Sequence, residues 1–293
     1  MKINLKNKVM LAVLAGGMLC MGQALAGAGP YYYGDAFNVN GWKATTENMW
    51  SITDARTVGA NLTLYGTESY IDERLPSNNI PFAEVKKFFA GYSETGNVTN
   101  NTITIKDGTF DGREIYGGWT SEGSATGNKV TISGGTFIGG SIYGGNVDDN
   151  GGDASNNTVT ISGGTFGDDV SIAGGSTKSN SGNMSGNIVR ISGGDFGTVN
   201  IVACSGNNTT GEVKNNLVEI TGGTFTDGFT LGGRDCLSVT SINNTLNLKI
   251  KISGKATQVV FFQKMNFTLP ADIANGDTML ETASVTYDNT IIG

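Results

Sequence analysis

The 293 residues of this chain contain no His. The side chains that could act as catalytic acids, bases or ligands are therefore mainly carboxylates, together with Lys and Arg. The commonest general base, the Ser-His and Cys-His nucleophile pairs and the usual zinc and copper ligands are therefore missing. Two carboxylates suffice for glycoside hydrolysis, and acidic residues with calcium and a Lys or Arg can serve a polysaccharide lyase. The candidates are Asp111, Arg113 and Glu114, and a second group of Asp168, Asp169 and Arg190. These carboxylates share no repeated position, so we expect no catalytic residue and no enzyme activity.

One acidic loop has ligands suited to calcium. Residues 147–153 include Asp148, Asp149 and Asp153, but their spacing matches neither an EF-hand nor the nonapeptide of calcium-binding β-rolls. A solvated loop is the favoured interpretation, and we expect no metal and no cofactor. The net charge of -7 and the absence of a basic stripe argue against nucleic acid or anionic lipid as partners.

A recurring ten-residue phrase indicates the architecture that carries these residues. Its copies, such as NTVTISGGTF, return every 27 to 30 residues, which is the spacing of stacked structural units. The phrase starts at Asn101, Asn128, Asn157, Asn187 and Asn216, with a weaker copy at Asn244. Apolar and polar residues alternate within it, which predicts a half-buried β-strand.

Small-residue corners and a Phe complete each repeat. Gly-Gly follows the strand in four copies and Asp107-Gly108 in the first, and Gly adopts positive φ without steric cost. The Phe residues after these corners are Phe110, Phe137, Phe166, Phe196 and Phe225. Five or six residues later an apolar pair precedes a second small-residue corner, such as Gly144-Gly145. Residues 119–127 and their equivalents are expected to leave the coil as polar loops.

Three short strands and three corners per period predict an all-β fold, a right-handed parallel β-helix of about five to six coils over residues 97–254. Stacking coils about 4.8 Å apart would place each Phe on the next and let the Asn amides bond from coil to coil. We therefore assign the Asn and Phe columns a structural role. A disulfide between Cys204 and Cys236 would join adjacent coils and is geometrically feasible in an oxidising compartment.

The two ends of the chain lack the repeat. Residues 1–26 have the charged start, the apolar run and the small-residue cleavage site of a secretory signal. Residues 27–96 are expected to cap the solenoid, with a helix around residues 83–92 after Pro81. Residues 255–293 are interpreted as the C-terminal end of the solenoid. After the signal, no apolar segment is long enough to span a membrane.

The signal followed by VTISGGTF and IYGG coils resembles the passenger region of bacterial autotransporters, the type V secreted surface proteins with pectin-lyase-like β-helices. Residues 265–280 resemble the segment that follows the coils in such passengers. The resemblance covers residues 1–26 and about 97–293, and its motifs specify a repeat style more than a particular protein. It implies export through the periplasm, display on the cell surface or release from it, and commonly adhesion or biofilm roles.

One departure from that family concerns its C-terminal translocator, an outer-membrane β-barrel of alternating strands, which this sequence lacks. Either the sequence is a truncated fragment, which we favour, or the passenger is exported by another route. We expect a non-enzymatic surface adhesin whose variable loops contact a host or neighbouring-cell protein or glycan. The alternatives are a polysaccharide lyase or hydrolase on a β-helix, and a passive surface spacer.

Overall fold

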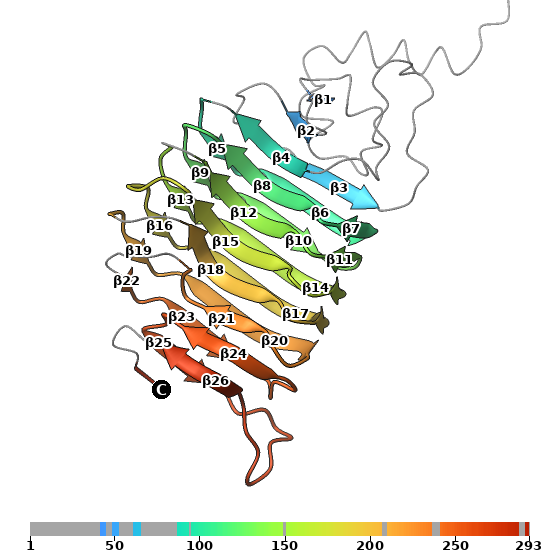
Figure 1. Ribbon diagram of the computed structural model, residues 1–293, viewed down its shortest axis with the longest axis vertical. Helices are drawn as coiled ribbons and strands as arrows, with labels where there is room; N and C mark the ends of the chain where they lie inside the picture. Colours follow the sequence, from blue (N-terminus) through green and yellow to red (C-terminus); the bar gives the residue numbers. More distant parts are fainter. Residues whose placement is uncertain are drawn as a thin grey trace, which may run out of the picture.

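The computed structural model describes residues 87–93, 95–148, 151–206, 210–235 and 241–286, and the backbone of strands 42–44, 49–52, 61–65 and 291–292. The signal predicted for residues 1–26, and most of the cap predicted for residues 27–96, lie outside these residues. The described chain is all-β, and its parallel strands stack into a β-solenoid of about seven turns (Figure 1). The predicted fold class is confirmed, with more coils than the five to six expected from the repeat.

Two long sheets form most of the solenoid wall. Sheet A contains, in spatial order, β1 (Trp42–Ala44), β2 (Met49–Ile52), β4 (Lys87–Ser93), β8 (Glu114–Thr120), β12 (Ser141–Val147), β15 (Ser171–Thr177), β18 (Asn200–Gly206), β21 (Thr230–Gly232), β24 (Lys255–Val260) and β26 (Glu281–Thr286). Sheet B contains β3 (Asn61–Tyr65), β6 (Thr102–Asp107), β10 (Lys129–Ile132), β14 (Thr158–Phe166), β17 (Ile188–Phe196), β20 (Leu217–Phe225), β23 (Thr245–Leu248), β25 (Lys264–Phe267) and β27 (Ile291–Ile292). Two further short strands extend it, because β11 (Thr136–Ile138) pairs with β14 and β7 (Thr109–Asp111) pairs with β11. Of the pairs in these sheets only β1 with β2 is antiparallel.

A third wall consists of two-residue strands in two short parallel sheets. These strands are β5 (Val98–Thr99), β9 (Ala125–Thr126), β13 (Ala154–Ser155), β16 (Met184–Ser185), β19 (Val213–Lys214) and β22 (Ser241–Ile242). They lie in the segments that the sequence predicts as loops, so the position expected for the third strand is wrong. The two strands expected on either side of the first Gly-Gly corner are instead joined in β14, β17 and β20, where register shifts mark a bulge.

The core lies between the sheets and contains the Phe column. All five rings are at most 2% exposed. Neighbouring rings stack with centroids 4.7–4.9 Å apart and interplanar angles of 4–13°. This separation matches the spacing of hydrogen-bonded strands, so the ladder itself sets the ring contact. Each buried Phe stabilises the fold by about 1.5–3 kcal/mol through removal of apolar surface from water.

The first small-residue corner has the predicted conformation. Its Gly residues have φ between 102° and 120°, a region that a side chain disfavours, and they are Gly108, Gly135, Gly164, Gly194 and Gly223. The second predicted corner is wrong, because its Gly pairs lie inside sheet A strands such as β8 and β12.

The predicted helix around residues 83–92 is also wrong, since Lys87–Ser93 is strand β4. Its side chains alternate: Phe88 packs against the core ring of Phe110, while Phe89 stacks on Tyr116 of β8 with ring centroids 5.0 Å apart. Pairing with β8 along its length overrides the local preference that suggested a helix. At the other end, β24 to β27 continue both sheets beyond the last recognisable repeat.

The Phe column predicts a large effect of truncation. Phe166→Ala should lower the free energy of unfolding by about 3–5 kcal/mol, because it leaves a cavity between two stacked rings. Urea denaturation followed by far-UV circular dichroism measures this loss. Ile138→Ala is the matched control, because Ile138 follows a column Phe but is 48% exposed. A loss below about 0.5 kcal/mol for Phe166→Ala would contradict a close-packed column.

Candidate functional site

The corner between the short strands and sheet B is the most constant part of the coil. It always consists of two residues, such as Gly127 and Asn128 between β9 and β10. The first residue has φ between 57° and 69°, which Gly and Asn tolerate best, and is Asn100, Gly127, Asn156, Gly186, Asn215 or Asn243. The second is the column Asn, whose side chain is at most 2% exposed in all six copies.

The column Asn residues form a continuous buried ladder. Asn157 donates from its backbone N and from Nδ2 to Oδ1 of Asn187, at 3.0 and 3.2 Å. Its Nδ2 also donates to the Ala125 carbonyl at 2.8 Å. Its Oδ1 accepts from the backbone N and Nδ2 of Asn128, at 2.9 and 3.1 Å. The amide therefore uses both N–H groups and both lone pairs, which satisfies it fully in the absence of water.

Glycines of sheet A make room for this ladder. A Cβ on Gly145 would lie 2.4 Å from Asn157 Oδ1, and one on Gly118 would lie 2.5 Å from Asn128 Cγ. The Gly pairs that look like a second corner are thus needed for close approach and not for a turn. Cys204 pairs in register with Gly175 and is fully buried. Its predicted partner Cys236 lies outside the described residues.

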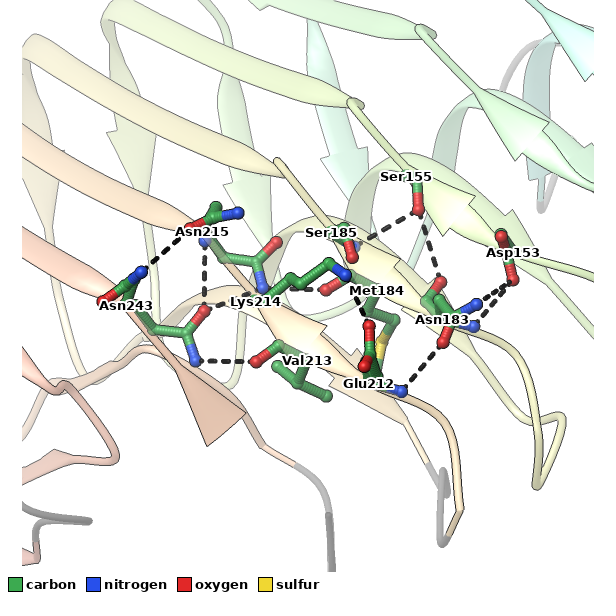
Figure 2. A network of polar contacts seen from close by, with 12 residues as sticks. Asp153, Ser155, Asn183, Met184, Ser185, Glu212, Val213, Lys214, Asn215 and Asn243 are labelled. Atoms are coloured by element: carbon green, nitrogen blue, oxygen red, sulfur yellow. Dashed lines mark hydrogen bonds and ion pairs between the residues drawn. The ribbon is translucent and has the colours of Figure 1, made fainter. Parts of the chain in front are cut away.

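A second ladder, polar and more exposed, runs along the outer edge of the short strands. In each step a side chain accepts from the backbone N of the equivalent residue one coil further on. Ser124 Oγ accepts from Asp153, Asp153 Oδ1 from Asn183, and Asn183 Oδ1 from Glu212, at 3.0, 2.8 and 2.9 Å. Figure 2 shows the last two of these contacts, with Ser155, Ser185, Lys214 and Asn215 beside them. Sequence reasoning missed this ladder, although a polar residue stands four positions before each of these column Asn residues.

The predicted calcium ligands have other partners. Asp148 forms an ion pair with Lys178 at 2.7 Å, and Asp153 belongs to the outer ladder. Asp149 lies outside the described residues. Within the described ranges, no cluster of three or more His, Cys, Asp or Glu residues could hold a metal ion.

The residues of the first catalytic candidate group do not share one environment. Asp111 is exposed at the end of β7, and Arg113 is buried. Glu114 accepts from the Tyr116 hydroxyl at 2.6 Å and pairs with Lys87 at 3.2 Å. Burial, and then the charge of Glu114, raise the pKa of Tyr116 far above its usual range. Tyr116 is thus held as a neutral donor to Glu114.

The second catalytic candidate group also bonds locally. Asp168 accepts from Thr198 Oγ1 and backbone N, at 2.6 and 3.0 Å, and these bonds lower the pKa of its carboxyl. Asp169 has φ of 61° in the adjoining turn. Arg190 pairs with Glu219 and not with either Asp, at 3.2 Å. A carboxyl with a lowered pKa is suited to accepting hydrogen bonds and poorly suited to donating a proton.

Glu219 lies between two cations on the outer face of sheet B. Lys249 Nζ is 2.7 Å from Glu219 Oε1, and Arg190 Nε is 3.2 Å from Oε2. The hydrogen bond from Lys249, aided by the contact with Arg190, lowers the pKa of Glu219. This triad links three successive coils, so its two ion pairs form only when the coils are stacked.

Comparison with known proteins identifies no relative: no family model, no curated protein and no solved structure matches the chain. In the part of the chain that the structure describes, no helix has the length and apolarity needed to cross a membrane. The function must therefore be argued from the geometry of the coils.

The buried ladder predicts unequal effects for two adjacent Asn residues. Asn157→Ala removes the acceptor of the Asn128 backbone N, and each buried donor left unpaired costs about 1–3 kcal/mol. Asn156→Gly is the matched control, because Asn156 is exposed and Gly occupies the equivalent positions 127 and 186, and it should change stability by at most about 0.5 kcal/mol. Urea unfolding of both variants measures the difference, and equal losses would contradict the ladder.

The Glu219 triad predicts a dependence on pH. Because the folded-state pKa of Glu219 is lowered, its contribution is present above the unfolded-state pKa and is lost as pH falls through the folded-state value. Glu219→Gln should therefore lower the free energy of unfolding by up to about 1 kcal/mol at pH 7, and by much less at pH 3. Thr160→Gln, on the same outer face, is the control for urea unfolding at both pH values. An equal effect of Glu219→Gln at pH 7 and pH 3 would refute this assignment.

Proposed function

We propose that the chain is an exported surface or secreted β-solenoid that contacts a protein or glycan of a host or neighbouring cell. The contacts would be made by the loops that connect sheet A to the short strands, which we call the edge loops. They occupy residues 121–124, 148–153, 178–183 and 207–212, and the connection that follows the bridge from Asp235 to Ser205. In this proposal the protein acts by binding and not by catalysis.

The observation that carries the proposal is that the edge loops vary in length, whereas the corner between each short strand and sheet B does not. The edge loops have four residues at 121–124 and six at 148–153, 178–183 and 207–212, whereas every corner between a short strand and sheet B keeps two residues. The short strands that receive these loops follow one another down one edge of the solenoid (Figure 1). Loops that vary on a rigid scaffold are typical of binding surfaces.

The edge loops bond to one another, which favours a preorganised binding surface. Lys178 of one loop pairs with Asp148 of the preceding loop at 2.7 Å. Gly152 N donates to the Gly123 carbonyl at 2.8 Å, and Thr210 N donates to the Asn180 carbonyl at 2.9 Å. A loop that is already ordered loses less conformational entropy when it binds. The exposed groups there are amides, hydroxyls and charges, which suit polar contacts with a sugar or a protein.

The directions of the carboxyl pKa shifts favour binding over glycan cleavage. A glycosidase needs one carboxyl whose pKa is raised, so that it stays protonated and can serve as general acid. In the described residues, hydrogen bonds lower the pKa of three carboxyls, those of Asp168, Glu219 and Asp277.

A loop exchange tests the proposal. Residues 178–183 can be replaced by the shorter sequence of residues 121–124, which retains a polar side chain at the outer ladder. Binding of the purified chain to a panel of immobilised neutral and acidic glycans and matrix proteins should fall at least tenfold for the bound probe, about 1.4 kcal/mol. The far-UV circular dichroism of the variant should stay that of the parent.

Thr160→Arg provides the control on the opposite wall, where the next coil has Arg190. It should leave binding unchanged. Binding that survives exchange of each described edge loop would contradict the proposal, as would turnover of a glycan in the same panel. Absence of binding to every probe would favour a passive spacer.

A further inference from the structure

Three Asn-Gly pairs occur in the sequence, at residues 40–41, 150–151 and 275–276. In such a pair the backbone N of the Gly can attack the carbonyl carbon of the Asn side chain, because Gly has no side chain to obstruct the approach. Ammonia leaves as a five-membered imide forms, and water then opens the imide. Opening at one carbonyl gives aspartate, and opening at the other gives isoaspartate, in which the backbone runs through the side chain. The reaction needs only water and makes Asn a thermolabile residue.

A turn at residues 274–277 leaves one of these pairs open to attack. Gly276 has φ of 93°, as the third residue of a type II turn requires, and Asp277 N donates to the Ala274 carbonyl at 3.1 Å. Asn275 and Gly276 are both exposed, and a Cβ on Gly276 would meet no atom within 4 Å. No hydrogen bond among the described residues engages the Asn275 side chain or Gly276 N. The side-chain amide and its nucleophile are thus both accessible.

The pair at residues 150–151 has the same sequence but a different environment. Gly151 is buried, and its N donates to the Asp148 carbonyl at 3.3 Å. A Cβ on Gly151 would lie 2.2 Å from Val147 Cγ1 and 2.7 Å from the Gly123 carbonyl oxygen. To attack, Gly151 N would have to break its hydrogen bond and leave a packed site. Asn150 itself, like residues 40–41, lies outside the described residues.

The exposed turn belongs to the connection between β25 and β26, and two contacts hold this connection to the preceding coil. Asp277 Oδ1 pairs with Lys251 Nζ at 2.6 Å, and Ile252 N donates to the Met279 carbonyl at 2.9 Å. Within the turn, Asp277 Oδ2 accepts from Ala274 N at 2.8 Å. An isoaspartate at position 275 would add one atom to the backbone of the turn and a negative charge beside Asp277. Both changes disturb the placement of the carboxylate that pairs with Lys251.

We propose that Asn275 is a site of spontaneous modification in the folded protein, where water converts it to aspartate and isoaspartate with release of ammonia. The modification loosens the connection between β25 and β26 from the preceding coil. Asn150 is protected, because Gly151 N is bonded and packed. This proposal depends on the turn and on the buried Gly151, and it is independent of the proposed binding function.

Ageing of the purified full chain at mildly alkaline pH tests the modification. Tryptic peptides 130–178 and 265–293 carry the two sites separately, and mass spectrometry with electron-transfer fragmentation distinguishes isoaspartate from aspartate. In the folded chain, product should accumulate at least tenfold faster at Asn275 than at Asn150. In the urea-unfolded chain the two rates should agree, because each Asn then precedes an accessible Gly. Equal rates in the folded chain, or no product at Asn275, overturn the proposal.

Asn275→Gln is the matched variant, because it keeps Gly276 in the turn but would have to close a less favourable six-membered ring. It should form no product at position 275 and should leave the rate at Asn150 unchanged. Hydrogen exchange then measures the loosening. The Ile252 amide should exchange at least tenfold faster in modified protein than in Asn275→Gln aged in parallel, while the β14 amides stay protected in both. Equal exchange of Ile252 in the two samples overturns the proposed loosening.

Discussion

The column of buried Asn amides is the constraint on which the coil geometry depends. A buried amide without partners is costly, and here an amide such as that of Asn157 finds its partners in the coils before and after it. A slip of one residue between coils would leave donors and acceptors unpaired in a buried site. The ladder therefore specifies register as well as adding stability, and it fixes the two-residue corner that carries it. The left-handed residue before each Asn and the Gly of sheet A opposite it are consequences of that choice.

The stacked Phe rings and the Asn ladder share one repeat distance, that of hydrogen-bonded strands. The backbone ladder brings identical side chains to the same separation in every coil, and each column tolerates only residues that pack or bond well with themselves. Outward positions have no such requirement. The outer column of sheet B passes from Thr160 to Arg190 and Glu219, where charges of opposite sign happen to neighbour each other. Residue type thus varies at outward positions, where the side chain neither packs in the core nor bonds in the buried ladder.

The strands of sheet B and the two buried columns could be predicted from the sequence, because the alternation of apolar and polar residues and the strict repeat are both visible there. Val159 and Ile161 reveal a strand, and Phe166 and Asn157 reveal columns. A two-residue strand such as Ala154–Ser155 has no detectable period, so it was hidden in a polar stretch. The Gly pair at 144–145 has the composition of a corner, and only the position of Asn157 reveals that it is needed for space. In β4, the choice between helix and strand depends on β8, a contact that local sequence does not contain. The outer ladder had a signal, a polar residue four positions before a column Asn, but its purpose is visible only once the coils are stacked.

Parallel stacking pairs the strand edges and buries the core in the interior of a solenoid, but not at its two ends. Every inner coil obtains half of its hydrogen bonds and core contacts from each neighbour, so a terminal coil lacks half of both. Sheet A meets this problem at β1 by reversing strand direction, because an antiparallel strand pairs with the last parallel one without continuing the coil. The reversal needs no repeat, so the segment that makes it can depart from the repeated sequence, as residues 42–52 do. Val285 shows what a core position loses without a second neighbour: it is in register with the buried Val259, yet it is 42% exposed, because among the described strands β26 pairs only with β24.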